Sequence, residues 1–243
     1  MDSDAVASVI SAAIVLSVVE LVKLVTQKGL VCRHHARKLM HVGVGPIFLL
    51  TWRLFSDGPH AKYYAAVVPL GMTAKFALTG LGVIRGSFLG ADAEVRAMSR
   101  TGNRTELLRG PLAYGITFVV CTVRGFRQVG AAAALMALCF GDGLAEPVGR
   151  RYGEAPLGKL PWSPKKTWAG SLAVFFGSFV SSLAFAAIFH GWGFSSSPPG
   201  EVQPALLLAS IAGALVESLP LADVDNLLVP LVVFWVFSTI RPL

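Results

Sequence analysis

The sequence has few charged residues for its length. Asp, Glu, Lys and Arg make up 14% of the 243 residues, whereas roughly 25% is usual for a soluble domain. Hydrophobic residues account for 54% and occur in long blocks, without the alternation of polar and apolar residues expected at a protein surface. These two properties exclude an ordinary soluble domain and predict a membrane protein.

Several common signals are also missing. The three cysteines, Cys32, Cys121 and Cys139, are scattered and show neither zinc-site nor redox spacing. The phosphate-binding sequence GxxxxGK[ST] does not occur, which excludes a P-loop. The start, Met1-Asp2-Ser3-Asp4, has neither the positive charge of a secretory signal nor the Ser/Arg-rich composition of a transit peptide. We therefore expect no presequence in this chain.

Eight apolar stretches are candidates for membrane-spanning helices, because a hydrocarbon core of about 30 Å requires roughly 20 apolar residues. They are 5–25, 39–55, 63–84, 111–123, 129–140, 168–189, 204–219 and 227–240. The fourth and fifth are short, and one of them is alternatively a buried or re-entrant segment. We expect an all-α, polytopic transmembrane helical bundle of about seven or eight spans, forming a single domain over residues 1–243.

The net charge is +7, and the basic residues are distributed unevenly between the two sides of these spans. Fourteen of the 21 basic residues fall in loops 27–38, 85–110, 141–167 and 220–226, which share one face of the membrane. The positive-inside rule places this face in the cytosol or stroma. No aromatic-rich basic face accompanies the charge, so nucleic acid is not an expected partner. Lys75 lies within an apolar stretch and needs a partner or a polar cavity that the sequence does not identify.

The segment Gly141–Gly153 carries the first group of chemically informative residues. Asp142 and Glu146 are four residues apart, would share a helix face, and suit Mg²⁺, which prefers oxygen ligands. Arg150 and Arg151 offer forked donors to phosphate. Glycines let backbone approach a bulky anion closely, and here they are Gly141, Gly143, Gly149 and Gly153. Alternatively, Asp142 caps a helix and the arginines are ordinary positive-inside charges.

The rest of the same loop is basic. Lys159, Lys165 and Lys166 supply point charges for phosphate, and Thr167 supplies a hydroxyl. Gly170-Ser171 opens a helix whose N-terminal amides favour an anion. A metal–nucleotide complex needs carboxylates for the metal and cations for the phosphoryl oxygens. The sequence therefore predicts a nucleotide loop over about 141–171.

Further polar residues at the basic face have two possible roles each, one functional and one structural. Glu217, Asp223, Asp225 and Asn226 form a second acidic cluster that either binds metal or ribose, or caps helices and pairs with loop arginines. The second span begins with Arg37, Lys38 and His41. These residues either contact the phosphates or the substrate, or anchor the span at the membrane interface. His41 is a possible proton acceptor, and Arg109 at the membrane edge is a candidate phosphate contact.

Several segments resemble phytol kinases and farnesol kinases, which are related to dolichol kinase. They occur in the family's order and are Arg37–His41, Ser99–Gly102, Glu106–Leu112, Gly141–Gly153, Lys165–Ser171, Glu217–Pro220 and Asp225–Leu227. The chain departs from the usual plant pattern at Glu146-Pro147, where that pattern has Asp-Ile, and in the offset of Asp223 from Asp225. These departures concern the preference for the alcohol substrate and for the phosphoryl donor.

The resemblance implies a CTP-dependent, Mg²⁺-requiring kinase of a prenyl alcohol, with phytol first and farnesol or geranylgeraniol as alternatives. UTP is a possible second donor. It also implies a chloroplast membrane and tocopherol biosynthesis. The first candidate for a catalytic group is Asp142 and the second is His41. The expected partners are the lipid bilayer, the prenyl alcohol and a nucleoside triphosphate.

Two other functions are alternatives to this one. Phosphatidate cytidylyltransferases contain a run that Ser163–Gly170 resembles, but the Gly-, His- and Asp-rich metal motif expected after it does not follow Ser171. A small transporter would place charge along a transmembrane path, as Lys75 and Glu217 could. The concentration of basic residues on one face argues against the transporter.

Overall fold

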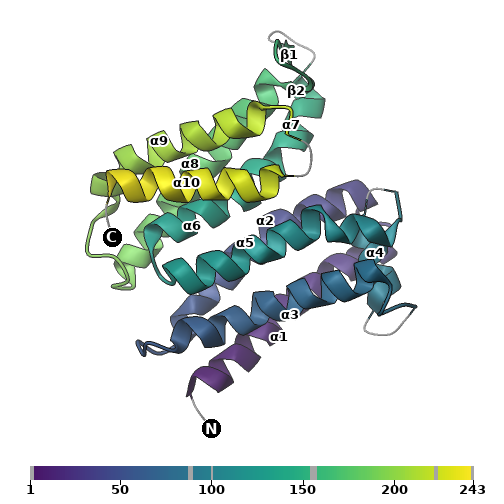
Figure 1. The fold of residues 1–243 in the computed structure, drawn as a ribbon, viewed down its shortest axis with the longest axis horizontal. Coiled ribbons are helices and arrows are strands. Elements are labelled where there is room, and N and C mark those ends of the chain that lie inside the picture. Colours follow the sequence, from purple (N-terminus) through teal and green to yellow (C-terminus); the bar gives the residue numbers. More distant parts are fainter. Residues whose placement is uncertain (1–2, 87–89, 100, 154–157, 222–223, 242–243) are drawn as a thin grey trace. The chain divides into compact units, whose positions relative to one another are not determined.

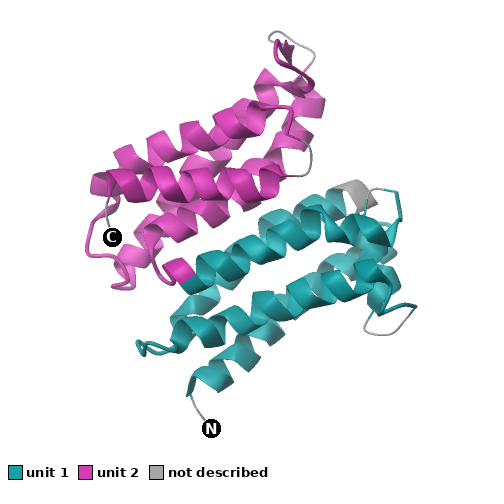
Figure 2. Ribbon diagram, in the orientation of Figure 1, with its two compact units in different colours: residues 1–123 teal, residues 124–243 magenta. Residues whose placement is uncertain are grey.

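The computed structural model describes residues 3–86, 90–99, 101–153, 158–221 and 224–241, and most of them are helical (Figure 1). The all-α prediction is confirmed. The chain divides into two compact units, Met1–Val123 and Arg124–Leu243 (Figure 2). Each unit is described by itself, and the single domain over residues 1–243 stays a prediction.

The first unit is built from four long helices and a short one. They are α1 (Ser3–Gln27), α2 (Arg33–Thr51), α3 (Ala61–Leu81), the short α4 (Ala91–Met98) and α5 (Gly110–Gly125), with 3₁₀ turns at Trp52–Leu54 and Arg104–Leu108. Helix α1 packs against α2 and α3, and α4 packs against α2. The predicted loop 85–110 therefore contains α4 and a 3₁₀ turn, and α2 begins within the predicted loop 27–38.

Polar contacts hold the apolar helices of this unit in register. The carboxylate of Asp4 on α1 accepts hydrogen bonds of 2.7 Å from the backbone N and the Oγ of Ser56. The hydroxyls of Ser11 and Thr51 join α1 to α2 at 2.7 Å. Such bonds stabilise helix pairs where surrounding lipid provides no competing partner.

The second unit surrounds a buried central helix. Its elements are α6 (Val129–Met136), a π-helical segment (Ala137–Asp142), α7 (Gly143–Tyr152), β1 (Lys159–Leu160), β2 (Ser163–Thr167), α8 (Trp168–Gly191), α9 (Pro199–Ser218) and α10 (Asp225–Ile240). Every residue of α6 is buried. Its alanines allow α8 and α10 to pack closely against it.

The described part of the chain contains six helical segments that are long and apolar enough to cross a membrane. They are Ser3–Gln27, Ala61–Leu81, Arg104–Gly125, Val129–Tyr152, Trp168–Gly191 and Pro199–Ser218, with Asp225–Ile240 as a shorter apolar helix. Large apolar side chains such as Val67, Phe176 and Trp235 are more than half exposed, as a lipid-facing surface requires. The chain is a multi-pass membrane protein.

The predicted loop 141–167 differs most from the structure. The helix that starts at Val129 continues without a break through the π-helical segment and α7 to Tyr152. Glycines disfavour a helix, so the sequence indicated an end at Phe140. Packing overrides that preference, because a Cβ on Gly141 would lie 2.6 Å from the Oγ of Ser178 on α8.

Candidate functional site

Charged residues from four separate segments meet at one end of the second unit. Asp142 ends the π-helical segment, Lys166 lies on β2, Glu217 is near the end of α9 and Asp225 begins α10. The Lys166 ammonium forms an ion pair with Oε1 of Glu217, and its Nζ lies 3.5 Å from Oδ2 of Asp225. We call these four residues the Lys166 cluster.

The carboxylates of the cluster keep Lys166 charged. Burial acts to lower the pKa of the ammonium, but Glu217, Asp225 and Asp142 more than offset this effect, so that the pKa is raised above its ordinary value. Three carboxylates around one ammonium leave an excess of negative charge. The cluster therefore suits a further cation.

The π-helical segment sets the position of Asp142. Such segments are rare and often occur at functional sites. Helix α8 lies directly on this one, because a Cβ on Gly177 would stand 2.9 Å from the carbonyl oxygen of Phe140. Within the described residues, the Asp142 side chain makes no capping hydrogen bond to α7. Its predicted alternative role as a helix cap is therefore not seen.

Glu217 provides an oxygen that a metal ion could use. Its side chain is buried, and Oε2 has no hydrogen-bond partner within the described ranges. No group of three or more His, Cys, Asp or Glu in the described part of the chain is placed to hold a metal ion. Mg²⁺ bound with a nucleotide needs only one or two carboxylates, since phosphates and waters complete its shell. The donor set therefore fits a nucleotide-bound Mg²⁺, although it does not form a closed metal cage.

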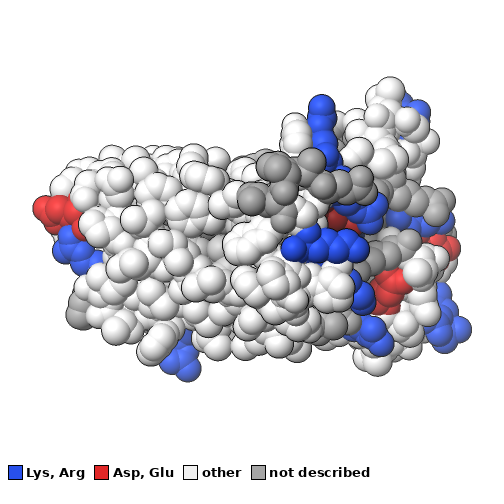
Figure 3. Space-filling view, turned by 90° about the horizontal axis from the view of Figure 1, so that it is seen from above, with Lys and Arg blue, Asp and Glu red and all other residues white. Residues whose placement is uncertain are grey.

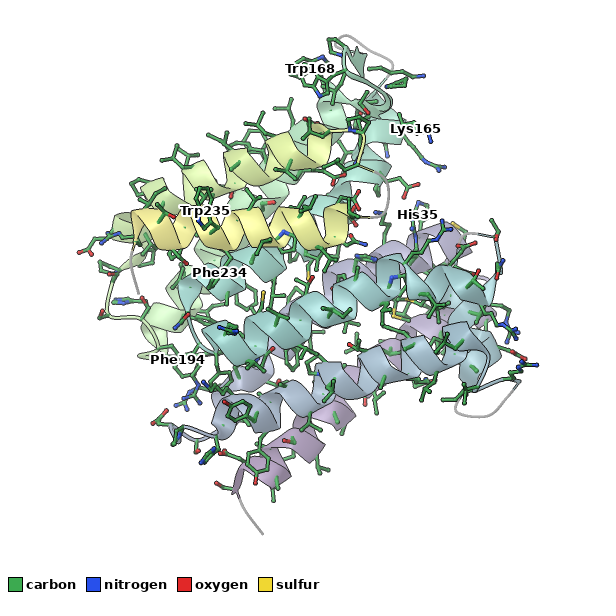
Figure 4. The ribbon with its side chains drawn as sticks, viewed as in Figure 1. His35, Lys165, Trp168, Phe194, Phe234 and Trp235 are labelled. Carbon is green, nitrogen blue, oxygen red and sulfur yellow. The ribbon has the colours of Figure 1, made fainter. Side chains whose placement is uncertain are left out.

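A small hairpin brings Lys166 to the cluster. Strands β1 and β2 pair antiparallel, with Lys159 opposite Thr167. The indole Nε1 of Trp162 donates to Oγ of Ser218 at 3.3 Å, which ties the hairpin to the end of α9. The Trp162 and Trp168 rings meet edge to face at 5.7 Å, and Figure 4 shows Trp168 and Lys165 at this end of the unit. The sequence did not predict the hairpin.

The other predicted phosphate-binding residues surround the same end of the unit. Arg150 pairs with Glu146 at 2.9 Å, so Glu146 is engaged by a cation one helical turn away. The Arg151 guanidinium lies over the Tyr152 ring. Four of these basic residues are exposed, namely Arg150, Arg151, Lys159 and Lys165. On the face drawn in Figure 3, Lys and Arg gather densely at one end and leave a broad uncharged band beside them.

The predicted glycines and hydroxyls of this region have packing roles. A Cβ on Gly149 would lie 2.9 Å from Oγ1 of Thr167, and a Cβ on Gly170 would lie 3.1 Å from the carbonyl oxygen of Ala145, so α7 and α8 touch through backbone. Thr167 caps α8 by accepting from the Gly170 amide at 3.1 Å. Gly143 is buried at the start of α7, while Gly153 follows α7 and Ser171 lies in the first turn of α8. Nucleotide contact by these residues stays a prediction.

The remaining predicted residues lie elsewhere. Arg37, Lys38 and His41 are on α2 and Arg109 follows a 3₁₀ turn, all in the first unit, and their contact with a nucleotide stays a prediction. The backbone N of Asn226 donates to Oδ1 of Asp225 at 3.0 Å. Asp223 lies outside the described residues.

The sequence of this chain has relatives among known proteins. The model of the cytidylyltransferase family matches residues 2–220. Probable phytol kinase 2, chloroplastic, of Oryza sativa subsp. japonica is 37% identical over 95% of this chain and 74% of its own length. Farnesol kinase, chloroplastic, of Arabidopsis thaliana is 36% identical over 82% of this chain and 63% of its own.

Phytol kinase 1, chloroplastic, of Arabidopsis thaliana is 32% identical over 85% of this chain and 66% of its own length. No solved structure matches the chain. The family match includes Asp142, Lys166 and Glu217 of the Lys166 cluster and ends before Asp225. The chain therefore belongs to the cytidylyltransferase family, among relatives that are phytol and farnesol kinases.

Proposed function

We propose that this protein is a CTP-dependent kinase that transfers the γ-phosphoryl group of CTP to the hydroxyl of an isoprenoid alcohol. The Lys166 cluster carries the proposal, because it joins carboxylates and a charged lysine from four distant segments at one end of a membrane unit. The names of the relatives supply phytol as the first substrate and farnesol as an alternative, and the sequence resemblance adds geranylgeraniol. UTP is a second donor to test.

The reaction is ROH plus CTP giving ROPO₃²⁻, CDP and a proton. Phosphoryl transfer depends mainly on positioning and on electrostatic stabilisation of the phosphates. When bound with the nucleotide, Mg²⁺ would supply positive charge that offsets the charge of the phosphates. We assign its protein ligands to Asp142, Glu217 and Asp225, with Glu146, Asp223 and Asn226 as further candidates.

The basic residues of the second unit act on the phosphates. Arg150 and Arg151 offer forked donors, and Lys159 and Lys165 are exposed ammonium groups near the cluster. Lys166 holds Glu217 and Asp225 in place and keeps a proton throughout. From the sequence resemblance alone, the proposal extends to phosphate contacts by Arg37, Lys38 and Arg109, and to a chloroplast membrane with the site on its stromal side.

A second function is favoured by one observation. The matching family model is described as cytidylyltransferase, and Ser163–Gly170 resembles the run found in phosphatidate cytidylyltransferases. That reaction would release pyrophosphate from CTP, whereas the kinase releases CDP. The products therefore separate the two functions directly.

The test uses purified full-length protein in detergent with labelled CTP, Mg²⁺ and a panel of phytol, farnesol, geranylgeraniol and phosphatidic acid. We expect CDP and a prenyl monophosphate from the wild type. Asp142→Asn and Glu217→Gln should reduce turnover by roughly 100-fold or more, as the loss of one electrostatic contact to the transition state does. Glu201→Gln is the matched control, because Glu201 lies near the opposite end of α9 and is exposed.

The control variant should keep wild-type turnover. Release of pyrophosphate with phosphatidic acid would replace the kinase by the cytidylyltransferase. Unchanged turnover in Asp142→Asn would remove Asp142 from the site. Transport of an alcohol into liposomes without nucleotide consumption would instead favour a transporter.

A further inference from the structure

The first unit contains a partly open cavity lined by residues of α1, α2, α3, α4 and α5. The space open to the centres of water-sized spheres measures about 80 Å³, several times the roughly 10–15 Å³ that one water requires. Most of the lining is apolar, with Val19, Val44, Phe48, Val68 and Phe76 among its side chains. An apolar cavity of this kind favours a hydrocarbon ligand over water.

One end of the cavity is polar. Glu94 on α4 is in the lining and only 2% exposed. Its Oε1 lies 3.3 Å from Nζ of Lys75, whereas Oε2 is buried without a hydrogen-bond partner in the part of the chain that the structure describes. A buried carboxylate oxygen without a donor is costly. Glu94 therefore keeps an unused hydrogen-bond acceptor beside the cavity.

The charges at this end do not favour a charged head group. Lys23 also lines the cavity and pairs with Glu20 at 2.7 Å, while Lys75 pairs with Glu94. The two pairs cancel, so neither an anionic nor a cationic head group gains a net attraction. A neutral O–H group is different, because it can donate to Oε2 of Glu94 without bringing a charge. The chemistry points to an apolar chain that ends in a hydroxyl.

We propose that this cavity binds the isoprenoid alcohol, with its chain among the apolar side chains and its hydroxyl donating to Glu94. The inference rests on the proposed function for the identity of the ligand. The lining also contains His41, whose ring meets that of Tyr114 edge to face at 4.7 Å. His41 is thus part of the alcohol site.

The polar end lies on one side of the first unit. Lys23 is near the end of α1, Lys75 is in the last third of α3 and α4 follows α3. All three are therefore on the side of the unit where α1 and α3 end. The distribution of basic residues in the sequence predicts that this side and the nucleotide loop face the same side of the membrane. A bound alcohol would present its hydroxyl toward that face and its chain toward the membrane interior.

The direct test is photo-crosslinking of the wild-type protein without nucleotide. Full-length protein in nanodiscs is irradiated with a farnesol analogue that carries a diazirine on its chain, and the labelled residues are mapped by mass spectrometry. We expect labels in α1, α2 and α3 at Val19, Val44 and Val68, which excess farnesol removes. Labels confined to lipid-facing positions such as Val67, or equal competition by a fatty acid, would overturn the proposal.

A second measurement tests the hydroxyl contact. Farnesyl methyl ether has the same chain but no O–H donor. A hydrogen bond to a charged group predicts that farnesol competes for the wild-type site roughly tenfold or more better than the ether. This preference should fall to roughly twofold in Glu94→Gln, in which the acceptor is no longer charged. Equal competition by the alcohol and the ether in the wild type would remove Glu94 from the site.

Two matched substitutions on α3 test the position of the chain. Val68→Phe fills the cavity and should reduce labelling roughly tenfold or more, whereas Val67→Phe, on a side chain that is 54% exposed, should leave it unchanged. Phosphorylation of farnesol is measured separately. Labelling of the cavity without phosphorylation would sink the kinase proposal alone, and phosphorylation with labels outside the cavity would sink the cavity proposal alone.

Discussion

Nζ of Lys75 on α3 lies 3.3 Å from Oε1 of Glu94 on α4. The Glu94 side chain is 2% exposed and that of Lys75 is 19% exposed, so the two charges are removed from water together. The sequence places Lys75 in an apolar stretch without an evident partner. The partner comes from α4, a short helix within a segment that the sequence predicts to be a loop.

Lys75→Met should destabilise the first unit, because it leaves Glu94 buried beside apolar groups. Removing one member of a buried pair costs about 3–5 kcal/mol, and thermal unfolding in detergent would detect such a loss. Lys28→Met is the control, since Lys28 is exposed. The double variant Lys75→Met/Glu94→Gln should recover much of the loss. An unchanged Tm in Lys75→Met would show that the pair contributes nothing.

The same variant should respond to pH in a defined direction. Burial raises the pKa of Glu94 above its ordinary value of 4.5, against the attraction of Lys75 and Lys23. Without Lys75 the folded-state pKa rises further, so the folded protein binds a proton more tightly than the unfolded chain. Stability of the variant therefore increases as pH falls through that pKa. The Tm difference from wild type should be smaller at about pH 5 than at about pH 8, and a larger difference at low pH would contradict this assignment.

The Lys166 cluster allows stability and activity to be separated. Lys166→Met leaves Glu217 and Asp225 without their cation, which should lower the Tm and reduce turnover by roughly 100-fold. Adding Glu217→Gln removes the unpaired buried charge and should restore the Tm, but not turnover. Restoration of both would mean that the cluster is only structural.

Local chemistry in the sequence was sufficient to predict most of the helices. The apolar stretches around α1, α3, α8 and α9 are long, and their helices lie close to the predicted limits. The π-helical segment could not be foreseen, because the packing of α8 against Phe140 and Gly141 maintains it. Glycine and charge after Phe140 indicated a loop, and tertiary contacts prevailed over that local preference.

The site was predicted in its components but not in its pairings. Asp142, Lys166, Glu217 and Asp225 were all expected at the basic face. Spacing along the chain could not predict that Lys166 would pair with Glu217. The two residues are 51 positions apart, and a hairpin that the sequence did not predict brings Lys166 to the end of α9. The ion pair of Glu146 with Arg150 was not expected either, and the role of Asp142 and Glu146 as metal ligands stays a prediction.

Gly177 should be intolerant of substitution. A Cβ there would stand 2.9 Å from the carbonyl oxygen of Phe140, and backbone cannot move aside as a flexible side chain can. Gly177→Ala should therefore cost about 1–3 kcal/mol and shift Asp142, so that turnover falls with Tm. Gly191→Ala on the same helix meets nothing within 4 Å and should be neutral in both measurements. Equal behaviour of the two variants would contradict the close packing of α8 on the π-helical segment.

Substitutions of Thr167 distinguish a capping role of its hydroxyl from a contact with the nucleotide. Its Oγ1 accepts from the Gly170 amide at 3.1 Å, and loss of such a cap costs about 1 kcal/mol. Thr167→Val should therefore lower the Tm, while Thr167→Ser keeps the hydroxyl and should preserve it. If the hydroxyl only caps α8, the KM for CTP should change little in either variant when it is measured well below the Tm. A raised KM in Thr167→Val at an unchanged Tm would instead assign the hydroxyl to the nucleotide, because a lost cap has to reduce stability.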